Sequence, residues 1–311
     1  MLSYLCCRLL LTIPVVLGIL LITFGIKSLI PTDAVTAMFQ GQVTDAEGAK
    51  AIANMRAEFG LDQPWYIQFG HYVDGVMHGN LGTSIRTRRP ALVEIGFRYL
   101  KTLELTAAAL GVALLIGVIS GVVAAYYRDT WIDVTATTVS LFGISMPTFF
   151  FGLLVIIFFS VWLRWLPVMP RGWTALLLPA VTLGLIESAS LARVTRASML
   201  EVLSRDYIRA ARAKGVSDMR LLFGHALPNA LLSVATIVGL QIGHLLCGAF
   251  IIEVIFGWHG IGELAVRAIE WRDLSITQGI ILIGSASFVL LNLVIDLLYA
   301  WIDPRIDYRS A

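Results

Sequence analysis

Long apolar runs alternate with shorter polar segments along this chain, and this pattern decides its class. Six runs are each about 17 residues or longer, within the range that an α-helix needs to cross a hydrocarbon core of ~30 Å. They occupy residues 9–30, 103–127, 134–162, 175–191, 229–256 and 275–301. The pattern predicts an all-α integral membrane protein with six transmembrane helices.

The third run is longer than a single span requires. As one helix at ~1.5 Å per residue it would reach about 44 Å, well beyond the bilayer core. Pro147, which follows Ser145 and Met146, removes one hydrogen bond from such a helix. We therefore predict a kink at this proline, or a short half-helix before the main span.

Residues 31–98 interrupt the apolar pattern. They are polar, carry charges of both signs and are punctuated by glycine. Two amphipathic helices are predicted there, at residues 46–59 and 64–77. The apolar contacts of the second are predicted to be Trp65, Ile67, Phe69, Tyr72 and Val76. A segment of this size is predicted to form a compact extracytoplasmic insert.

The pattern divides the chain into consecutive parts. Residues 1–30 form an anchor helix, 31–98 the insert and 99–302 a five-helix core, and 303–311 form a cytoplasmic tail. The core contains one cytoplasmic loop of special interest, residues 199–228.

This loop is strongly basic. From Arg205 to Pro228 its basic residues are Arg205, Arg209, Arg212, Lys214 and Arg220, and its acidic residues are Asp206 and Asp218. Basic excess in a short loop marks the cytoplasmic side of a membrane protein, so both termini of a six-span chain are predicted to be cytoplasmic. The loop is predicted to hold a short helix that is capped by Ser204 or Asp206 and ended by Gly215 in the left-handed conformation. Pro228 suits the first turn of the next helix.

Composition supports a membrane protein and excludes several functions. The chain is 58% hydrophobic and 14% charged, whereas soluble domains are about a quarter charged. A net charge of +2 does not indicate a nucleic-acid partner. The sequence has no G-x-x-x-x-G-K-S/T phosphate loop, so it does not hydrolyse ATP by that mechanism. Its three cysteines have no metal-site spacing and give no disulfide framework.

Four residues in the apolar runs are candidates for a translocation path: Glu187, Ser145, Pro147 and His244. Glu187 lies about two-thirds along the fourth run, where a carboxylate is costly and marks a path or an ion pair. No basic residue lies in the middle of a predicted span, so the sequence offers Glu187 no ion-pair partner. The alternative is a structural hydrogen bond to Ser190 or to a neighbouring helix. For His244 an interhelical hydrogen bond is favoured over a ligand role.

Other polar and small residues of the spans are interpreted as structural. Glu253 and Asp296 lie near span ends, where interfacial or helix-pairing roles are favoured. Gly239 and Gly243 have the spacing that permits close helix packing.

The basic loop resembles the EAA loop of ABC-importer permeases, E-A-A-x-x-x-G-x9-I-x-L-P. The matching residues are Ala210, Ala211, Gly215, Leu227 and Pro228, while Arg209 stands at the Glu position and His225 at the Ile position. With Asp206, Tyr207 and Lys214, the segment DYIRAARAKG is similar to the peptide/nickel branch, the B-type dipeptide and oligopeptide permeases. Residues 60–64 and 79–84 resemble two further signatures of that branch, with Asn80 in place of the usual Asp.

This resemblance implies a type I importer (MetI-like) permease fold in the bacterial inner membrane. The loop would be the coupling helix, which docks on a separate ATPase. The implied partners are a paralogous permease that completes a heterodimer, two ATP-binding subunits, an extracytoplasmic solute-binding protein and the lipid bilayer. ATP and Mg would be bound by the ATPases, with no cofactor in this chain. Members of the branch carry peptides, nickel chelates or glutathione.

Two other classes are weighed against this importer permease. A stand-alone ion-coupled secondary transporter would use Glu187 and Asp296 as proton or cation sites, but no internal repeat of hydropathy is clear. An intramembrane hydrolase would need a motif such as G-x-S-x-G or HExxH, and the sequence has neither.

Overall fold

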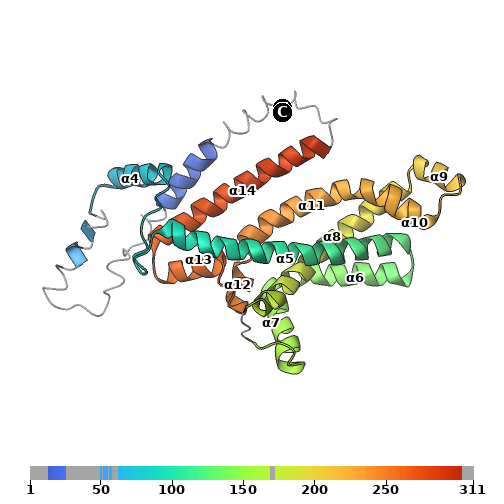
Figure 1. The fold of residues 1–311 in the computed structure, drawn as a ribbon, viewed down its shortest axis with the longest axis horizontal. Coiled ribbons are helices and arrows are strands. Elements are labelled where there is room, and N and C mark those ends of the chain that lie inside the picture. The colour runs from blue at the N-terminus through green and yellow to red at the C-terminus, as the bar shows by residue number, and fades with distance from the viewer. Residues whose placement is uncertain are drawn as a thin grey trace. The chain divides into compact units, whose positions relative to one another are not determined.

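The structure is a computed structural model that describes residues 13–25, 50, 52–54, 56–57, 62–168 and 172–302. The described residues are almost entirely helical (Figure 1). The helices are Ile13–Gly25, α4 (Trp65–Met77), α5 (Ala91–Tyr126), α6 (Trp131–Ser145), α7 (Thr148–Ile156), α8 (Thr174–Leu203), α9 (Asp206–Ala213), α10 (Asp218–Arg220), α11 (Leu227–Gly248), α12 (Phe250–Phe256), α13 (Ile261–Glu270) and α14 (Leu274–Ile302). Two π-helical segments, η1 (Ile157–Trp162) and η2 (Leu221–Ala226), extend α7 and precede α11.

Several helices can cross a membrane by length and composition. Four qualify alone, namely α5, α8, the continuous helix Asp218–Leu246 and α14, and the bent pair α6 and α7–η1 adds a fifth if it is one span. Ile13–Gly25 is a shorter apolar helix inside the predicted anchor. The all-α membrane class is confirmed. That the chain crosses the membrane six times remains a prediction.

The chain folds as two compact units, of which the first contains residues up to Leu100 and His259–Leu293. Its core joins the start of α5, α13 and the first half of α14 around Ile95, Leu264 and Ile276. Helix α4 agrees with the predicted helix 64–77, and two of its predicted contact residues, Phe69 and Tyr72, pack against Phe24.

Two details of this unit differ from the prediction. Trp65 and Ile67 are exposed, so they are not the packing residues of α4. The predicted helix 46–59 lies largely outside the described residues, as do the tail 303–311 and the ends of the first apolar run.

The second unit, which includes Lys101–Trp258 and α14 from Val294 onward, contains the candidate site residues. Helix α8 is its centre and contacts α6, α7, α11 and α12. Glycines permit a close approach between α5 and α8: a Cβ on Gly121 would lie 2.6 Å from the Ala192 carbonyl oxygen, and one on Gly184 would lie 2.5 Å from Cβ of Val112. Gly239 of α11 likewise lies close to α14, since a Cβ added to it would lie 2.8 Å from Cδ1 of Ile295. This agrees with the predicted close helix packing.

The third apolar run is interrupted at Pro147, as the sequence predicts. The break is sharper than a kink, because α6 and α7–η1 meet at an angle of 106°. The chain is extended at Met146 and Pro147, which ends α6 and restarts the helix at Thr148. The packing of α7 on α8 and α12 then sets its direction, since Gly152 faces Ile252 and Phe256.

Two other span limits also need correction. Helix α5 begins at Ala91, inside the predicted insert, because its first turns are buried in the first unit through Ala91 and Ile95. The fifth helix is already continuous from Asp218 and ends at Gly248, and a separate α12 follows.

Candidate functional site

The basic loop forms an exposed helix at the end of α8 (Figure 1). Its helix α9 begins after Arg205, whose backbone is extended, and no side chain caps it. The predicted cap by Ser204 or Asp206 is therefore wrong. The Ser204 hydroxyl donates to the carbonyl of Glu201, and Asp206 is already in the first turn, where its carboxylate contacts Arg209.

Gly215 ends α9 in the left-handed conformation, as predicted. Its φ is +83°, and the amide of the next residue, Val216, donates to the carbonyl of Ala211. A Cβ at Gly215 would meet nothing within 4 Å. The requirement for glycine thus comes from the backbone, which L-residues with a Cβ adopt at a cost.

Helix α9 has one buried side chain, Ile208, and exposes most of its remaining surface. Tyr207, Arg209, Ala210 and Lys214 are exposed, while Ala211 is half-buried. The arginines form local exposed ion pairs, Arg205 with Glu201 at 2.8 Å and Arg212 with Asp218 at 3.4 Å. Because exposed pairs contribute little stability, these side chains can exchange partners at small cost.

The end of the motif has the predicted form. Leu227 begins α11 and Pro228 lies in its first turn. Leu227 packs against the core that joins α5 and α8 around Val122 and Met199. The motif therefore links α9 to the interior of the unit.

The structure brings two of the four predicted path residues together. Oε1 of Glu187 on α8 lies 3.1 Å from Nδ1 of His244 on α11. The expectation that Glu187 lacks a partner in the chain is therefore wrong, because the sequence does not reveal that α8 and α11 pack side by side. The predicted interhelical hydrogen bond of His244 is confirmed. One turn earlier, Nε2 of Gln241 donates to the Glu187 carbonyl at 2.9 Å.

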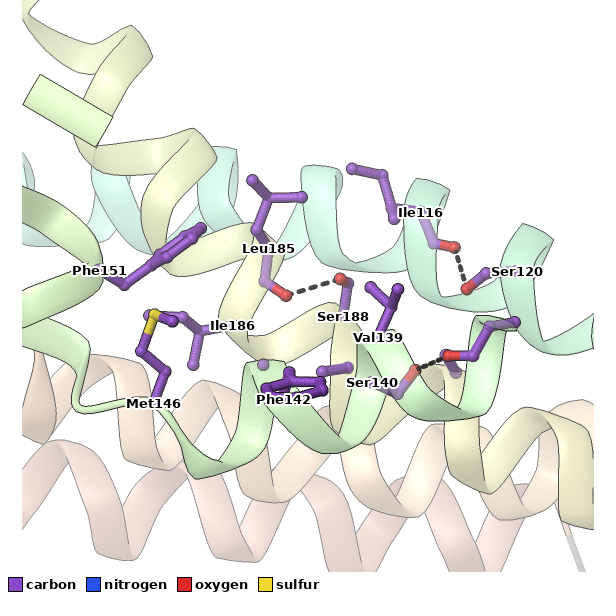
Figure 2. A pocket seen from close by; sticks show the side chains of 14 residues that line it. Ile116, Ser120, Val139, Ser140, Phe142, Met146, Phe151, Leu185, Ile186 and Ser188 are labelled. Atoms are coloured by element: carbon purple, nitrogen blue, oxygen red, sulfur yellow. Dashed lines mark hydrogen bonds between the residues drawn. The ribbon is translucent and has the colours of Figure 1, made fainter. Parts of the chain in front are cut away.

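The other two path residues lie at the break between α6 and α7. Ser145 and Pro147 are exposed on either side of Met146. Met146 lines a cavity of about 490 Å³ between α5, α6 and α8, shown in Figure 2, and Glu187 is not among its lining residues. The four residues thus do not form one cluster.

This cavity is apolar in effect, although it contains serines. The hydroxyls of Ser120, Ser140 and Ser188 each donate to a carbonyl of their own helix, at 2.7, 2.8 and 2.7 Å (Figure 2). The remaining lining is mostly hydrocarbon, including Phe142 and Leu185. It offers a polar solute few hydrogen-bonding groups.

Sequence reasoning missed a buried ion pair beside the basic loop. Arg196 on α8 holds Asp133 on α6 with two hydrogen bonds, Nε to Oδ1 at 2.5 Å and Nη2 to Oδ2 at 2.6 Å. The amide of Asp129 also donates to Asp133, which is 4% exposed. The available signal was an acidic residue at the start of an apolar run, but its partner is distant in sequence.

Glu253 takes the helix-pairing role that its position predicts. It is fully buried and accepts a 2.7 Å hydrogen bond from Thr102 of α5. The side chain of Asp296 lies outside the described residues. No group of three or more metal-ligating side chains was found among the residues that the structure describes.

Comparison with known sequences connects this geometry to transport. Residues 113–308 match the family described as binding-protein-dependent transport system inner membrane component, and residues 1–105 match the N-terminal family of the same systems. The chain is 42% identical over 310 residues to the glutathione transport system permease protein GsiC of Escherichia coli, covering 99% of this chain and all of the relative. The proteins of that name from Salmonella choleraesuis and Salmonella typhi have the same identity and coverage.

Solved structures show the same fold at low sequence identity. An inward-facing structure of the MetNI methionine ABC transporter aligns with a TM-score of 0.58 and 17% identity, covering 67% of this chain and 96% of that one. An amino acid ABC transporter crystallised with histidines aligns with a TM-score of 0.52 and 17% identity, over 66% and 92%. The MetI-like permease fold is therefore shared.

Proposed function

The chain belongs to the family of binding-protein-dependent transport system inner membrane components, and from that premise we propose that it forms half of the translocation pore of an importer for glutathione or a related small peptide. It is a membrane permease subunit of an ABC importer and not a catalytic enzyme. The choice of solute rests on relatives that match this chain from end to end.

We propose that α9 binds the ATPase and transmits its movement to the permease. The observation that carries this proposal is an exposed helix, attached directly to the long α8 and ended by a glycine at φ +83°. The proposed contact surface consists of Asp206, Tyr207, Arg209, Ala210, Ala211, Lys214 and Gly215, with Leu227 and Pro228 at its base. An ATPase groove that binds α9 would move α8 with it.

The proposed assembly supplies what this chain lacks. Two ATP-binding subunits bind ATP and Mg at the cytoplasmic side, a paralogous permease completes the pore, and a solute-binding protein delivers the substrate outside. ATP binding closes the ATPases and opens the pore outward, and hydrolysis returns it to the inward-facing state. In this arrangement the chain lies in the bacterial inner membrane with both termini cytoplasmic.

The polar contact between α8 and α11 is proposed to face the path. A carboxylate and an imidazole inside membrane-spanning helices are costly against lipid, so they face water or protein. Ser145 and Pro147 are proposed to contribute at the α6–α7 break, where both are exposed.

Reconstitution tests the proposed function. The permease is co-expressed with its partner permease and ATPases, purified, placed in liposomes and supplied with the solute-binding protein and glutathione. Uptake is expected only when ATP is present on the side of the liposome membrane that carries the ATPases. The ATPases are also expected to co-purify with the wild-type permease. Uptake driven by an ion gradient without ATP would instead support a secondary transporter.

A further inference from the structure

In the contact between Glu187 and His244, the imidazole is the accessible group. The side chain of Glu187 is 12% exposed, whereas that of His244 is 72% exposed. A solute that reaches this part of α11 therefore meets the imidazole before the carboxylate. Glu187 lies behind the imidazole, with its Oε1 3.1 Å from Nδ1.

Hydrogen-bond accounting assigns the two ring nitrogens of His244. With Glu187 ionised, its carboxylate only accepts hydrogen bonds, and Nδ1 of His244 is then the donor in the 3.1 Å contact. In the neutral imidazole, Nε2 then keeps its lone pair and is an acceptor. A carboxylate behind the other nitrogen fixes the orientation and the tautomer of the ring.

Gln241 supplies a second polar contact to Glu187 from α11. It is buried, and its Nε2 donates to the carbonyl of Glu187 at 2.9 Å. Its Oε1 is buried without a hydrogen-bond partner in the part of the chain that the structure describes. Because residues three apart are neighbours on a helix, this acceptor lies one turn from His244.

The charge balance of the contact favours a cation. Within the described residues Glu187 forms no ion pair with a lysine or arginine. With His244 neutral, the contact carries the charge of one carboxylate. An exposed acceptor with a negative charge behind it suits a ligand group that donates hydrogen bonds and is positively charged, which is the chemistry of an ammonium.

We propose that His244, held in place by Glu187, binds the ammonium group of a peptide substrate as it passes through the permease. The proposal rests on the proposed function and names the chemical group that this site recognises. His244 is the contacting residue and Glu187 is a positioning residue.

The test compares two substrates that differ in the amine. Proteoliposomes containing the complete complex and its solute-binding protein take up glutathione or N-acetylglutathione, in which the ammonium is replaced by an amide. The same binding protein is used with every permease variant. A change in the ratio of the two KM values therefore arises in the permease.

The expected effect is a loss of discrimination. His244→Gln is expected to raise the KM for glutathione about tenfold, which is about 1.4 kcal/mol, and to change the KM for N-acetylglutathione much less. Glu187→Gln is expected to give a smaller change in the same direction, because the imidazole stays but loses the charge behind it. His71→Gln, an exposed histidine of α4, is the matched control and is expected to behave as wild type.

The outcomes separate this inference from the proposed function. If wild type takes up neither glutathione nor triglycine with ATP, the substrate class and the inference both fail. If wild type transports and His244→Gln keeps the wild-type ratio of KM values, only the inference fails. Should His244→Gln not assemble, the ratio measured with Glu187→Gln decides by the same criterion.

Discussion

At the scale of single residues, the ion pair between Asp133 and Arg196 is a contact whose disruption should cost much stability. Both oxygens of the carboxylate are bonded to the guanidinium, and Asp133 is almost completely buried. Such a pair contributes little compared with an apolar replacement, but removal of one partner leaves an uncompensated buried charge. The pair connects α6 to α8 close to the loop that begins at Ser204.

Removal of the arginine alone is expected to be strongly destabilising. Arg196→Gln should lower the stability of the purified complex by about 3 kcal/mol, because Asp133 is left buried without a counter-charge. Thermal unfolding in detergent measures the loss. Arg193→Gln, at an exposed position of the same helix, is the control and should change the midpoint little.

A double variant checks the physical reason. Asp133→Asn combined with Arg196→Gln should regain most of the stability lost by Arg196→Gln, since neither charge remains. Equal destabilisation by the Arg193 and Arg196 variants would contradict the prediction.

At the scale of elements, the orientation of α9 depends on the turn at its C-terminal end. The helix has only eight residues and one buried side chain, so it has little packing of its own. Its direction is set by the continuation from α8 and by the left-handed turn at Gly215. A change in that turn would redirect the exposed surface without affecting the core.

Gly215→Val is therefore expected to uncouple ATP hydrolysis from transport. A β-branched residue at φ +83° costs about 1–3 kcal/mol of backbone strain, so the turn would rearrange. Reconstituted complex should lose glutathione uptake and lose stimulation of its ATPase by the loaded binding protein. Gly215→Asn is the control, because asparagine tolerates the left-handed region. Wild-type coupling in the valine variant would refute the prediction.

At the scale of the whole molecule, the proposed orientation places two basic segments on opposite sides of the membrane. In the first unit, Arg86, Arg88 and Arg89 are exposed on a turn that is closed by the bridge between Thr83 and Pro90. The turn is anchored where the Ser84 hydroxyl donates to the buried Asp273 at 2.5 Å. In the second unit the basic segment is α9.

Thiol labelling of intact cells tests this orientation. In a chain whose three native cysteines are replaced by serine, Arg88→Cys should react with a membrane-impermeant maleimide added outside. Arg212→Cys, which is equally exposed but lies on α9, should react only after the cells are permeabilised. The reverse pattern would overturn the proposed topology.

The sequence alone determined the features that depend on local or periodic information. Apolar runs of span length predict the membrane class because a helix in lipid must satisfy its own backbone and expose hydrocarbon. The left-handed turn at Gly215, the first-turn position of Pro228 and helix α4 were predicted because each depends on a few consecutive residues. The motif around Ala210 and Ala211 indicated the family for the same reason.

Only the tertiary structure decided which distant residues meet. Glu187 and His244 are 57 positions apart, and Asp133 and Arg196 are 63 apart, so neither contact follows from helical spacing. Pro147 predicts an interruption of the third run, but the angle of 106° depends on how α7 packs against α8 and α12. Glu187 does not line the apolar cavity that its neighbours Ile186 and Ser188 line, because successive residues of a helix point in different directions.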